Sequence, residues 1–410
     1  MSKIFDLIKK LCPDGVEFRE IEEIFIMKNG YTPSKANKDF WENGTIPWFR
    51  MEDIRENGRI LSDSIRKITP QAVKCGKLIP KNSIIVATTA TIGEHALAIA
   101  DSFLMNQQFT SFTIRELLKD KLDVKFVFYY FFKICEWCKQ NTNSSSFPSV
   151  DMPRLKKVKF PVPPLEVQRE IVRILDCFTL LTAELTAELT AELTARKKQY
   201  EFYRDRLLSF DELNKNGGGC ELKMLGEVGE IRMCKRILKE QTSASGEIPF
   251  YKIGTFGKEP DAYIPKRLFD EYKARYSYPK IGEILISASG TIGRTVVFNG
   301  EDAYFQDSNI VWVENNESQV LNKYLFYFYQ IADWNIAEGG TIKRLYNDNL
   351  KKLKIPVPSL STQRKIVNIL DKFDTLVNSI SDGLPHEIEL RRKQYEYYRE
   401  LLLNFKEKSA

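Results

Sequence analysis

The residues of this 410-residue chain that could bind a metal or act as nucleophiles are few and widely spaced. Its seven cysteines include one Cys-x-x-Cys pair, Cys135 and Cys138, and its two histidines are His95 and His386. Such a pair supplies half of a tetrahedral zinc site, and the other half requires a second pair or neighbouring histidines. Because the sequence offers neither, we predict no metal site. Scattered cysteines in odd number are typical of reduced thiols in a cytosolic protein.

Catalytic motifs are also missing from the sequence. The strings closest to the Asn/Asp-Pro-Pro-aromatic motif of adenine methyltransferases are Val162-Pro-Pro-Leu165 and Val357-Pro-Ser-Leu360. Both lack the polar and aromatic residues that hold a flipped base. No Gly-x-x-x-x-Gly-Lys-Ser/Thr motif is present to bind ATP, and no glycine-rich loop follows a hydrophobic strand to bind S-adenosylmethionine. Gly217–Gly219 lies in a polar segment and is predicted to be a hinge. We therefore predict no catalytic residues and no cofactor.

The composition is that of a globular protein, with 43% hydrophobic and 28% charged residues, and the length suffices for two to three domains. The formal net charge of +6 is compatible with nucleic acid binding without indicating it. The longest apolar run, Phe126–Phe132, is far shorter than the roughly 20 residues of a membrane span, and we expect it to form a core helix. The first residues show neither an apolar stretch nor a cleavage site. We therefore expect a cytoplasmic protein with no membrane contact.

An internal repeat determines the predicted architecture. Residues 155–181 and 350–376 are identical at 17 of 27 positions, and residues 196–210 and 391–405 at 10 of 15, with the same offset of 195. The segments that precede these blocks diverge and share only short echoes, such as the string Thr-Ile-Gly. Two constant blocks therefore alternate with two variable modules.

The constant blocks have to position the variable modules, and their pattern is that of long amphipathic helices. Between Pro164 and Gly217 the first block contains no proline or glycine, and its apolar residues recur mainly every three or four positions. Within it, residues 182–193 are three tandem copies of the tetrapeptide Thr-Ala-Glu-Leu, and every leucine lies on the apolar stripe. One such unit changes the length of a helix by about 6 Å and keeps the stripe facing a partner. We interpret the repeat as an adjustable spacer, although slippage of a repetitive DNA tract could have produced it.

The second block repeats the stripe but contains Gly383 and Pro385, so we expect one helix to about Ser381 and another from about His386. The two blocks can pair antiparallel about a pseudo-twofold axis. The predicted fold is therefore α+β, with two globular α/β modules separated by two long helices that pair as an antiparallel coiled coil. The predicted boundaries are a first module at 1–154, a spacer helix at 155–210, a linker at 211–219, a second module at 220–349 and a C-terminal helix at 350–410.

This arrangement resembles one known family. The repeated string Gln-Arg-x-Ile-Val-x-Ile-Leu-Asp (168–176 and 363–371), the string Arg-Lys-Lys-Gln-Tyr-x-x-Tyr-Arg (196–204) and the Thr-Ala-Glu-Leu tract are similar to those of type I restriction–modification specificity subunits. The resemblance implies that each variable module is a target recognition domain for one half of a split, asymmetric site in double-stranded DNA. It also implies that the helices set the unspecified gap and dock two methyltransferase subunits, to which restriction/translocase subunits add. The subunit itself is non-catalytic in this family.

The resemblance directs attention to polar side chains of the modules, because base edges are read by Arg, Lys, Asn, Gln, Ser and Thr. The first module offers Thr89, Thr91, Gln107, Gln108, Asn143, Ser144 and Ser145. The second offers Ser289, Thr291, Arg294, Gln306, Ser308, Thr341, Lys343 and Arg344. The shared Thr-Ile-Gly string is also what a common strand and turn would require, and a shared feature cannot distinguish two half-sites. We therefore favour the loops 141–146 and 339–344, which precede the constant blocks.

For docking of the methyltransferase subunits we expect residues of the repeated strings. These are Gln168, Arg169, Lys198, Tyr200, Gln363, Arg364, Lys393 and Tyr395. Part of this surface could instead pack within the chain. The alternative function is a scaffold whose helices oligomerise and whose modules bind proteins rather than DNA. Two near-identical blocks beside two divergent modules favour recognition of two different targets.

Overall fold

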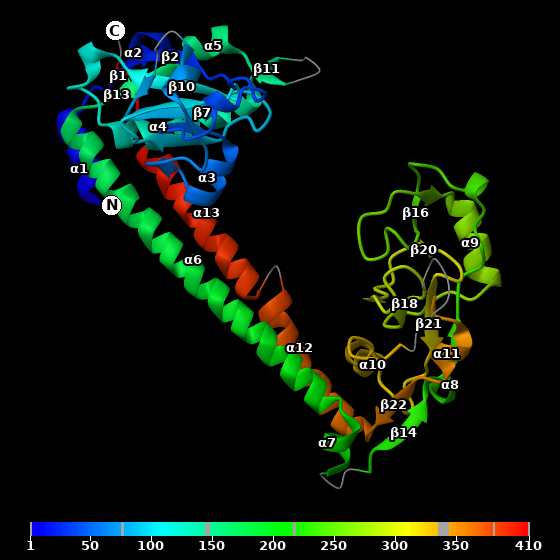
Figure 1. Cartoon of the computed structure of the whole chain (residues 1–410). Coiled ribbons are helices and arrows are strands. Elements are labelled where there is room, and N and C mark those ends of the chain that lie inside the picture. The colour runs from blue at the N-terminus through cyan, green and yellow to red at the C-terminus, as the bar shows by residue number, and fades with distance from the viewer. Residues whose placement is uncertain are drawn as a thin grey trace. The chain divides into compact units, whose positions relative to one another are not determined.

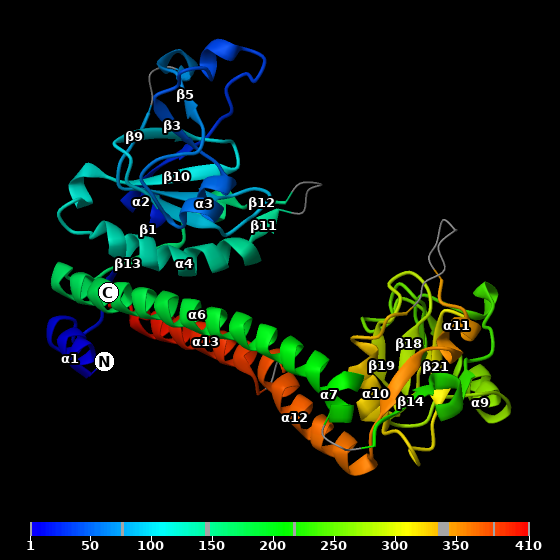
Figure 2. The same cartoon turned by 60° about the horizontal axis from the view of Figure 1, so that its bottom comes forward.

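The computed structural model describes residues 2–74, 78–143, 148–215, 219–334, 344–379 and 382–408. The chain forms two compact units, a first unit of residues 1–187 and 389–410 and a second unit of residues 188–388. Figure 1 and Figure 2 show the elements of both units. Within the described ranges, no helix is long and apolar enough to cross a membrane.

The first unit is a mixed α/β body. Its helices are α1 (Ser2–Leu11), α2 (Ile21–Ile24), α3 (Met51–Asn57), α4 (Val124–Gln140), α5 (Met152–Lys156), the first part of α6 (Leu165–Leu207), the second part of α13 (Leu384–Leu402) and the short 3₁₀ helices Lys38–Phe40, Pro70–Ala72 and Glu116–Leu118. Its strands are β1 (Glu17–Glu20), β2 (Phe25–Asn29), β3 (Ile46–Phe49), β4 (Ile60–Leu61), β5 (Lys67–Ile68), β6 (Ile79–Pro80), β7 (Ser83–Ala87), β8 (His95–Ala98), β9 (Ser102–Met105), β10 (Phe109–Ile114), β11 (Thr142–Asn143), β12 (Ser149–Val150) and β13 (Lys159–Val162). The two larger sheets have the orders β2-β10-β7-β8-β4 and β5-β3-β9-β6, and β1 pairs with β13.

Helix α4 packs between the larger sheet and α6, as Figure 2 shows, because its aromatic side chains require burial. The helix begins after Asp123, whose carboxylate accepts hydrogen bonds from the backbone N–H groups of Lys125 and Phe126 at 2.8 and 3.2 Å. Phe126 and Phe131 are fully buried. The prediction of a core helix for the aromatic run is therefore confirmed.

The cysteine pair of the sequence lies in this same core. The Sγ atom of Cys135 lies 3.4 Å from Nδ1 of His95, and Nε2 of His95 lies 3.2 Å from the carbonyl oxygen of Phe128. The carbonyl only accepts, so Nε2 of a neutral imidazole carries the proton and Nδ1 accepts from the thiol. Burial, reinforced by the charge of Arg59, lowers the pKa of His95 to about 3. The Cys135–His95 pair is therefore a contact of the core.

The second unit repeats this plan. Its helices are the second part of α6, α7 (Phe210–Lys215), α8 (Leu225–Val228), α9 (Lys266–Arg275), α10 (Asn322–Tyr329), α11 (Asn347–Lys351), α12 (Leu360–Asn378), the first part of α13 and the 3₁₀ helix Lys239–Gln241. Its strands are β14 (Glu221–Met224), β15 (Glu230–Arg232), β16 (Ile248–Tyr251), β17 (Tyr263–Ile264), β18 (Ile284–Ser287), β19 (Thr295–Val297), β20 (Tyr304–Phe305), β21 (Ile310–Glu314) and β22 (Lys354–Val357). The sheets β15-β21-β18-β19 and β17-β16-β20 match β2-β10-β7-β8 and β5-β3-β9 of the first unit. The predicted internal repeat is confirmed.

Antiparallel helix pairs connect the sequence repeat to the fold. In the first unit, the rings of Phe178 in α6 and Tyr398 in α13 lie 5.5 Å apart, and the hydroxyls of Thr179 and Tyr395 lie 3.0 Å apart. In the second unit, the ring of Tyr203 in α6 stacks on that of Phe373 in α12 at 5.8 Å. Residue numbers rise along one helix as they fall along the other, so the predicted antiparallel pairing is confirmed.

The spacer helix α6 is shorter than the predicted range 155–210, because α5 and β13 occupy the first residues of that range. It ends at Leu207, and α7 begins separately at Phe210. The leucines of the Thr-Ala-Glu-Leu repeats are half-buried, whereas their alanines and glutamates are exposed, as a seam requires. The break in the second block also starts earlier than predicted, because Ser379 at the end of α12 has an extended backbone. Ser381 lies outside the described residues. Helix α13 begins at Leu384 with Pro385 in its first turn, where proline is tolerated.

A buried glutamine fastens the start of each long helix to its own unit. The side-chain amide of Gln168 donates to the carbonyl oxygens of Pro163 and Lys121 at 2.6 and 2.8 Å, and its Oε1 accepts from the N–H of Asp123 at 2.8 Å. The Gln168 side chain is therefore fully satisfied, and the residue is 0% exposed. It ties the first turn of α6 to the segment that leads into α4.

Gln363 forms the same three contacts in the second unit. Its amide donates to the carbonyl oxygens of Pro358 and Gln319 at 2.8 Å, and its Oε1 accepts from the N–H of Leu321 at 2.8 Å. It too is 0% exposed. Tyr200 is also buried, with its hydroxyl 3.1 Å from Oε1 of Gln330. The expectation that Gln168, Gln363 and Tyr200 dock partner subunits is therefore wrong, because these side chains already pack within the chain.

The last residue of the repeated string serves the same purpose. In the first unit, Asp176 accepts a hydrogen bond from the hydroxyl of Tyr129 at 2.7 Å and lies 2.6 Å from Nζ of Lys125. In the second unit, Asp371 accepts from the hydroxyl of Tyr327 and pairs with Lys323. The glutamine and the aspartate of the string therefore hold each helix against α4 or α10.

Replacing Gln168 by alanine should destabilise the first unit by roughly 2–4 kcal/mol, because two carbonyl groups and one N–H group would lose their partner in a buried place. Urea unfolding of the full chain, followed by circular dichroism, measures the change. The matched control is Arg169→Ala at the next, exposed position, which should change the free energy of unfolding by less than about 0.5 kcal/mol. Equal effects of the two substitutions would contradict the role of Gln168.

The neutral, buried His95 predicts a pH dependence. The unfolded chain protonates this histidine near its ordinary pKa of 6.5, whereas the folded unit does so only near pH 3. Stability is therefore lost as the pH falls through this window, by up to about 1.4 kcal/mol per pH unit. In the variant His95→Thr, which carries the residue of the second unit's corresponding position, that slope should be smaller between pH 6 and pH 4. Unchanged slopes in urea unfolding at these pH values would disprove the assignment.

Candidate nucleic-acid interface

A shared turn after the central strand of each unit contains the Thr-Ile-Gly string. In the first unit the N–H of Gly93 donates to the carbonyl oxygen of Ala87 at 3.1 Å, and in the second the N–H of Gly293 donates to that of Ser287 at 3.0 Å. Both glycines have a positive φ, 91° and 82°. A Cβ atom would lie 2.5 Å from the Lys139 side chain at Gly93. The glycine of the string therefore has a structural role.

The loop that precedes each constant block lies against this turn. In the first unit Thr89 pairs with Ser149, and in the second Ser289 pairs with Arg344, each as an antiparallel bridge. The N–H of Leu345 also donates to the carbonyl oxygen of Ala288 at 2.8 Å. Two segments that the sequence keeps about 55–60 residues apart thus form one surface in each unit. Spacing along the sequence does not reveal this neighbourhood.

The structure divides the predicted DNA-contact residues by exposure. The exposed ones are Thr91, Gln107, Asn143, Thr291 and Arg344. The half-buried ones are Thr89, Gln108, Arg294, Gln306 and Ser308. Ser144, Ser145, Thr341 and Lys343 lie outside the described residues.

Some of these side chains are engaged inside their own unit. Ser289 is 5% exposed, and its hydroxyl donates to Oδ1 of Asn309 at 2.7 Å. This burial corrects the expectation that Ser289 contacts DNA, because its hydroxyl holds the turn instead. Gln306 accepts a hydrogen bond from the N–H of Ile253 at 3.0 Å, and Gln108 accepts one from the amide of Asn106 at 3.2 Å. These two glutamines therefore help to shape the surface.

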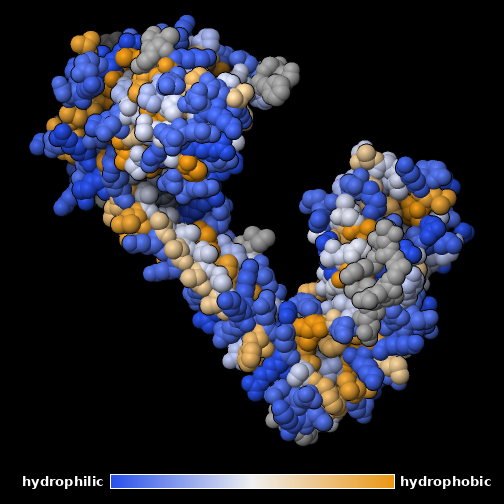
Figure 3. All heavy atoms as spheres, viewed as in Figure 1, coloured by the Kyte–Doolittle hydropathy of each residue, from blue (hydrophilic) through white to orange (hydrophobic). Residues whose placement is uncertain are grey.

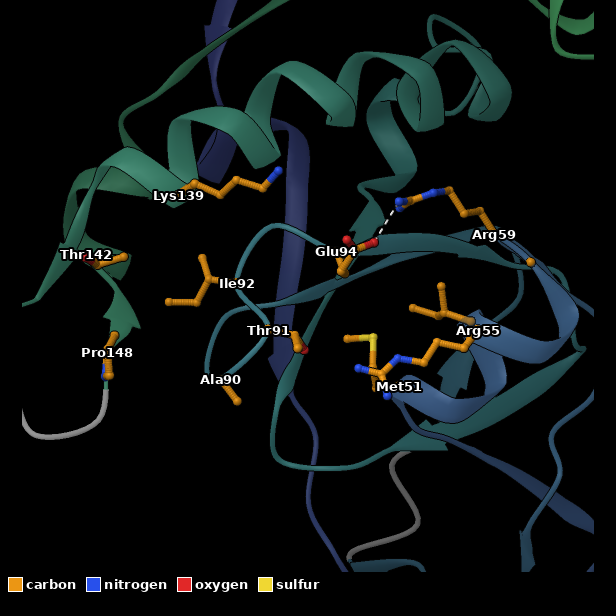
Figure 4. A pocket seen from close by; sticks show the side chains of 12 residues that line it. Met51, Arg55, Arg59, Ala90, Thr91, Ile92, Glu94, Lys139, Thr142 and Pro148 are labelled. Atoms are coloured by element: carbon orange, nitrogen blue, oxygen red, sulfur yellow. Dashed lines mark hydrogen bonds and ion pairs between the residues drawn. The ribbon is translucent and has the colours of Figure 1, made fainter. Parts of the chain in front are cut away.

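A hollow of about 790 Å³ adjoins the turn of the first unit. Figure 4 shows that side chains from α3, from the turn, from the end of α4 and from the β11–β12 hairpin line it. Its charged residues are Arg55, Arg59, Lys139 and Glu94. Glu94 lies 2.7 Å from Nη2 of Arg59, and Glu136 lies 2.6 Å from Nζ of Lys139, so among the described residues Arg55 is the cation of this lining without an ion-pair partner. The hollow suits an anionic or acceptor-rich ligand such as the edge of a nucleic acid.

Sequence reasoning missed the three basic residues of this hollow. They lie at positions 55, 59 and 139, outside the polar loops, and only folding gathers them beside Thr91. One signal was available in the sequence. Residues 44–50 and 246–252 are similar in sequence, whereas the segments that follow them are not. A basic residue directly after such an echo would have been a reasonable candidate.

The remaining candidates for docking are on the surface of the helices. Arg169, Arg364, Lys198 and Lys393 are exposed, and Tyr395 is half-buried. Among the residues that the structure describes, the guanidinium groups of Arg169 and Arg364 have no hydrogen-bond or ion-pair partner, which distinguishes them from the buried glutamines beside them. They are therefore available to another molecule.

A pair of aromatic residues at equivalent positions was missed. Phe202 in the second unit is 58% exposed, and Tyr397 in the first is 64% exposed. They are separated by the repeat offset of 195 and lie off the apolar stripe, which is the signal that could have found them. Figure 3 shows further hydrophobic residues at the surface along the helices, among which Leu180 and Leu181 are exposed. The helices thus carry exposed basic and aromatic residues at repeated positions.

Comparison with known proteins places these features in a context. A family model described as the type I restriction modification DNA specificity domain matches residues 13–195 and 218–390. The chain is 42% identical over 394 residues to the EcoprrI type I restriction enzyme specificity subunit of Escherichia coli, covering 93% of both chains. It is 60% identical over 299 residues to a Haemophilus influenzae protein that carries the name of a type I restriction enzyme specificity subunit, covering 70% of this chain and 74% of that one.

Solved structures show the same fold. The HsdS subunit from Thermoanaerobacter tengcongensis matches with a TM-score of 0.58 at 17% sequence identity, over 96% of both chains. A chain from a structure of a type I restriction–modification system matches with a TM-score of 0.69, also at 17% identity, over 96% of this chain and 98% of that one. At these identities the likeness concerns the fold alone.

Proposed function

Because the chain belongs to the type I restriction–modification DNA specificity family, we propose that it reads the DNA sequence for a restriction–modification complex. As a specificity subunit it is not itself an enzyme. Each unit is proposed to read one half of a bipartite site in double-stranded DNA. A complex of this kind acts on DNA inside the cell, so we also propose a cytoplasmic location.

The observation that carries this proposal is a shared frame with unlike surfaces. The two units have the same sheet orders and the same turn, yet the residues around the turn differ, as with Glu94 in one and Arg294 in the other. Sequence is read by side chains that reach base edges, whereas the backbone frame only places them. Unlike side chains on equal frames support two different half-sites rather than a palindrome.

The helices are proposed to set the unspecified gap between the half-sites. Helix α6 has 43 residues, which corresponds to about 64 Å and therefore to about 19 base pairs of duplex. Residues at its start pack in the first unit and residues at its end pack in the second. We propose that the length of this helix, rather than a flexible linker, sets the gap.

The repeated exposed residues of the helices are proposed to dock two methyltransferase subunits, to which restriction/translocase subunits add. Arg169 and Arg364 occupy equivalent positions, as do Lys198 and Lys393, and Phe202 and Tyr397. Exposed arginine and aromatic residues are the types enriched at protein interfaces. Two copies of one surface support two copies of one partner.

Gel shifts of the full chain, alone and with its methyltransferase subunit, on a random-sequence duplex pool test the proposal. We expect binding that weakens steeply between 50 and 200 mM salt and that enriches two short, different sequences at a constant separation. Binding of no DNA, or binding without enrichment of any sequence, would contradict it. A protein scaffold would give the first of these results.

Deleting one repeat unit, Thr190–Leu193, should shorten the helix by about 6 Å and the tolerated gap by one or two base pairs. Both half-sites should stay the same, because neither unit's turn is touched. Mapping of methylated sites in cells that carry the variant measures gap and half-sites together. The control Thr190→Ala keeps the length and should keep the gap, and a changed half-site in the deletion would refute the spacer.

A further inference from the structure

The segment after β3 in the first unit corresponds residue by residue to the segment after β16 in the second. The N–H of Asn106 donates to the carbonyl oxygen of Phe49 at 3.0 Å, and the N–H of Gln306 donates to that of Tyr251 at 2.9 Å. One residue later, the N–H of Arg50 donates to the Asp53 side chain at 2.6 Å. The N–H of Lys252 donates likewise to the Thr255 side chain at 3.2 Å. Counting onward from these matched bonds, Arg55 corresponds to Gly257.

The second unit fills the place of Arg55 with another guanidinium. Gly257 has a φ of +72°, and a Cβ atom on it would lie 3.7 Å from Cδ of Arg294. The Nη1 atom of Arg294 donates to the carbonyl oxygen of Phe256 at 2.9 Å. The Arg294 side chain therefore runs from the turn across the segment at the position where the first unit carries Arg55.

The first unit exchanges the two positions. Its turn carries Glu94, which pairs with Arg59 at 2.7 Å, and its guanidinium comes from α3 instead. In the first unit Arg55 and Arg59 both come from the segment after β3, whereas in the second unit Arg294 comes from the turn, so the guanidinium groups of the two units start from opposite sides. A shared frame that requires an arginine for stability alone would keep it at one position.

Arg55 is also the arginine of this region that is available to a ligand. Arg50 pairs with Glu52 and Arg59 with Glu94, whereas Arg55, within the described part of the chain, has no hydrogen-bond or ion-pair partner. It is exposed and lines the same hollow as Thr91. Figure 4 shows its side chain extending from α3 on the side of the hollow that faces Thr91.

We propose that Arg55 is a specificity-determining residue of the first unit, whose guanidinium reads a guanine edge in the first half-site. This inference rests on the proposed function and names the residue and base that it left open. Arginine donates two hydrogen bonds to O6 and N7 of guanine in the major groove. Phosphate contacts carry no sequence information, so a guanidinium placed differently in two otherwise equal frames fits a base contact better.

The test is enrichment of bound sequences from a random-sequence duplex pool, with the full chain and its methyltransferase subunit, for three variants. Arg55→Ala removes the guanidinium, and Arg55→Lys keeps the charge but loses the bidentate hydrogen-bond donor. The control Lys81→Ala removes an exposed lysine elsewhere in the unit. Thermal unfolding of each variant checks that it folds.

Both Arg55 variants should lose preference for one G·C pair in one half-site by roughly 10- to 100-fold, while the other half-site stays unchanged. Lys81→Ala should keep all preferences. An equal loss for every sequence with a shallower salt dependence would mean a phosphate contact and would overturn the inference. Unchanged preferences in both Arg55 variants would overturn it as well. If the parent chain enriches no sequence, the proposed function itself fails, which is a separate outcome.

Discussion

Each unit depends on one buried side-chain amide that joins a loop of the globular body to the first turn of a long helix. Gln168 and Gln363 each use both ends of the amide, and each is shielded from water. A buried polar group of this kind is favourable only in one geometry, because any slip leaves donors and acceptors unsatisfied. The aspartate eight residues later adds a second attachment through a tyrosine hydroxyl. Together they give each helix one orientation on its own unit, which the proposed role of the helices as a spacer requires.

The same constraint explains why the sequence is so unequally divided between constant and variable parts. The constant blocks contain the attachment residues and the helix seam, so substitutions there would disturb both packing and direction. The variable modules keep their sheet order and the glycine of the turn, since Gly93 and Gly293 both have a positive φ that strains any other residue. Around that turn the residues are free to differ, and they do, from Glu94 to Arg294 and from Arg55 to Gly257. The proposed reading of two unlike half-sites requires this combination of a constant backbone frame and variable side chains.

The sequence predicted the repeat, the antiparallel helices and the aromatic core helix, because these follow from periodicity and from identity at a constant offset. It could not distinguish the roles of neighbouring residues in one repeated string. Gln168 and Arg169 are repeated equally well, yet one is buried and the other exposed, and the difference depends on a backbone N–H about 45 residues away. It also missed Arg55, since a lone arginine on a short helix has no local pattern and becomes significant only beside Thr91. Contacts between residues that are distant along the chain cannot be predicted from a single sequence.

The central claim is that two unlike readers on one helical frame recognise two unlike half-sites at a fixed separation. Mapping of methylated positions across a genome, in cells that carry this chain with its partner subunits, tests it most directly. The account predicts two different short sequences separated by a constant number of unspecified bases. A single uninterrupted sequence, a palindrome, or half-sites at freely varying distances would contradict it.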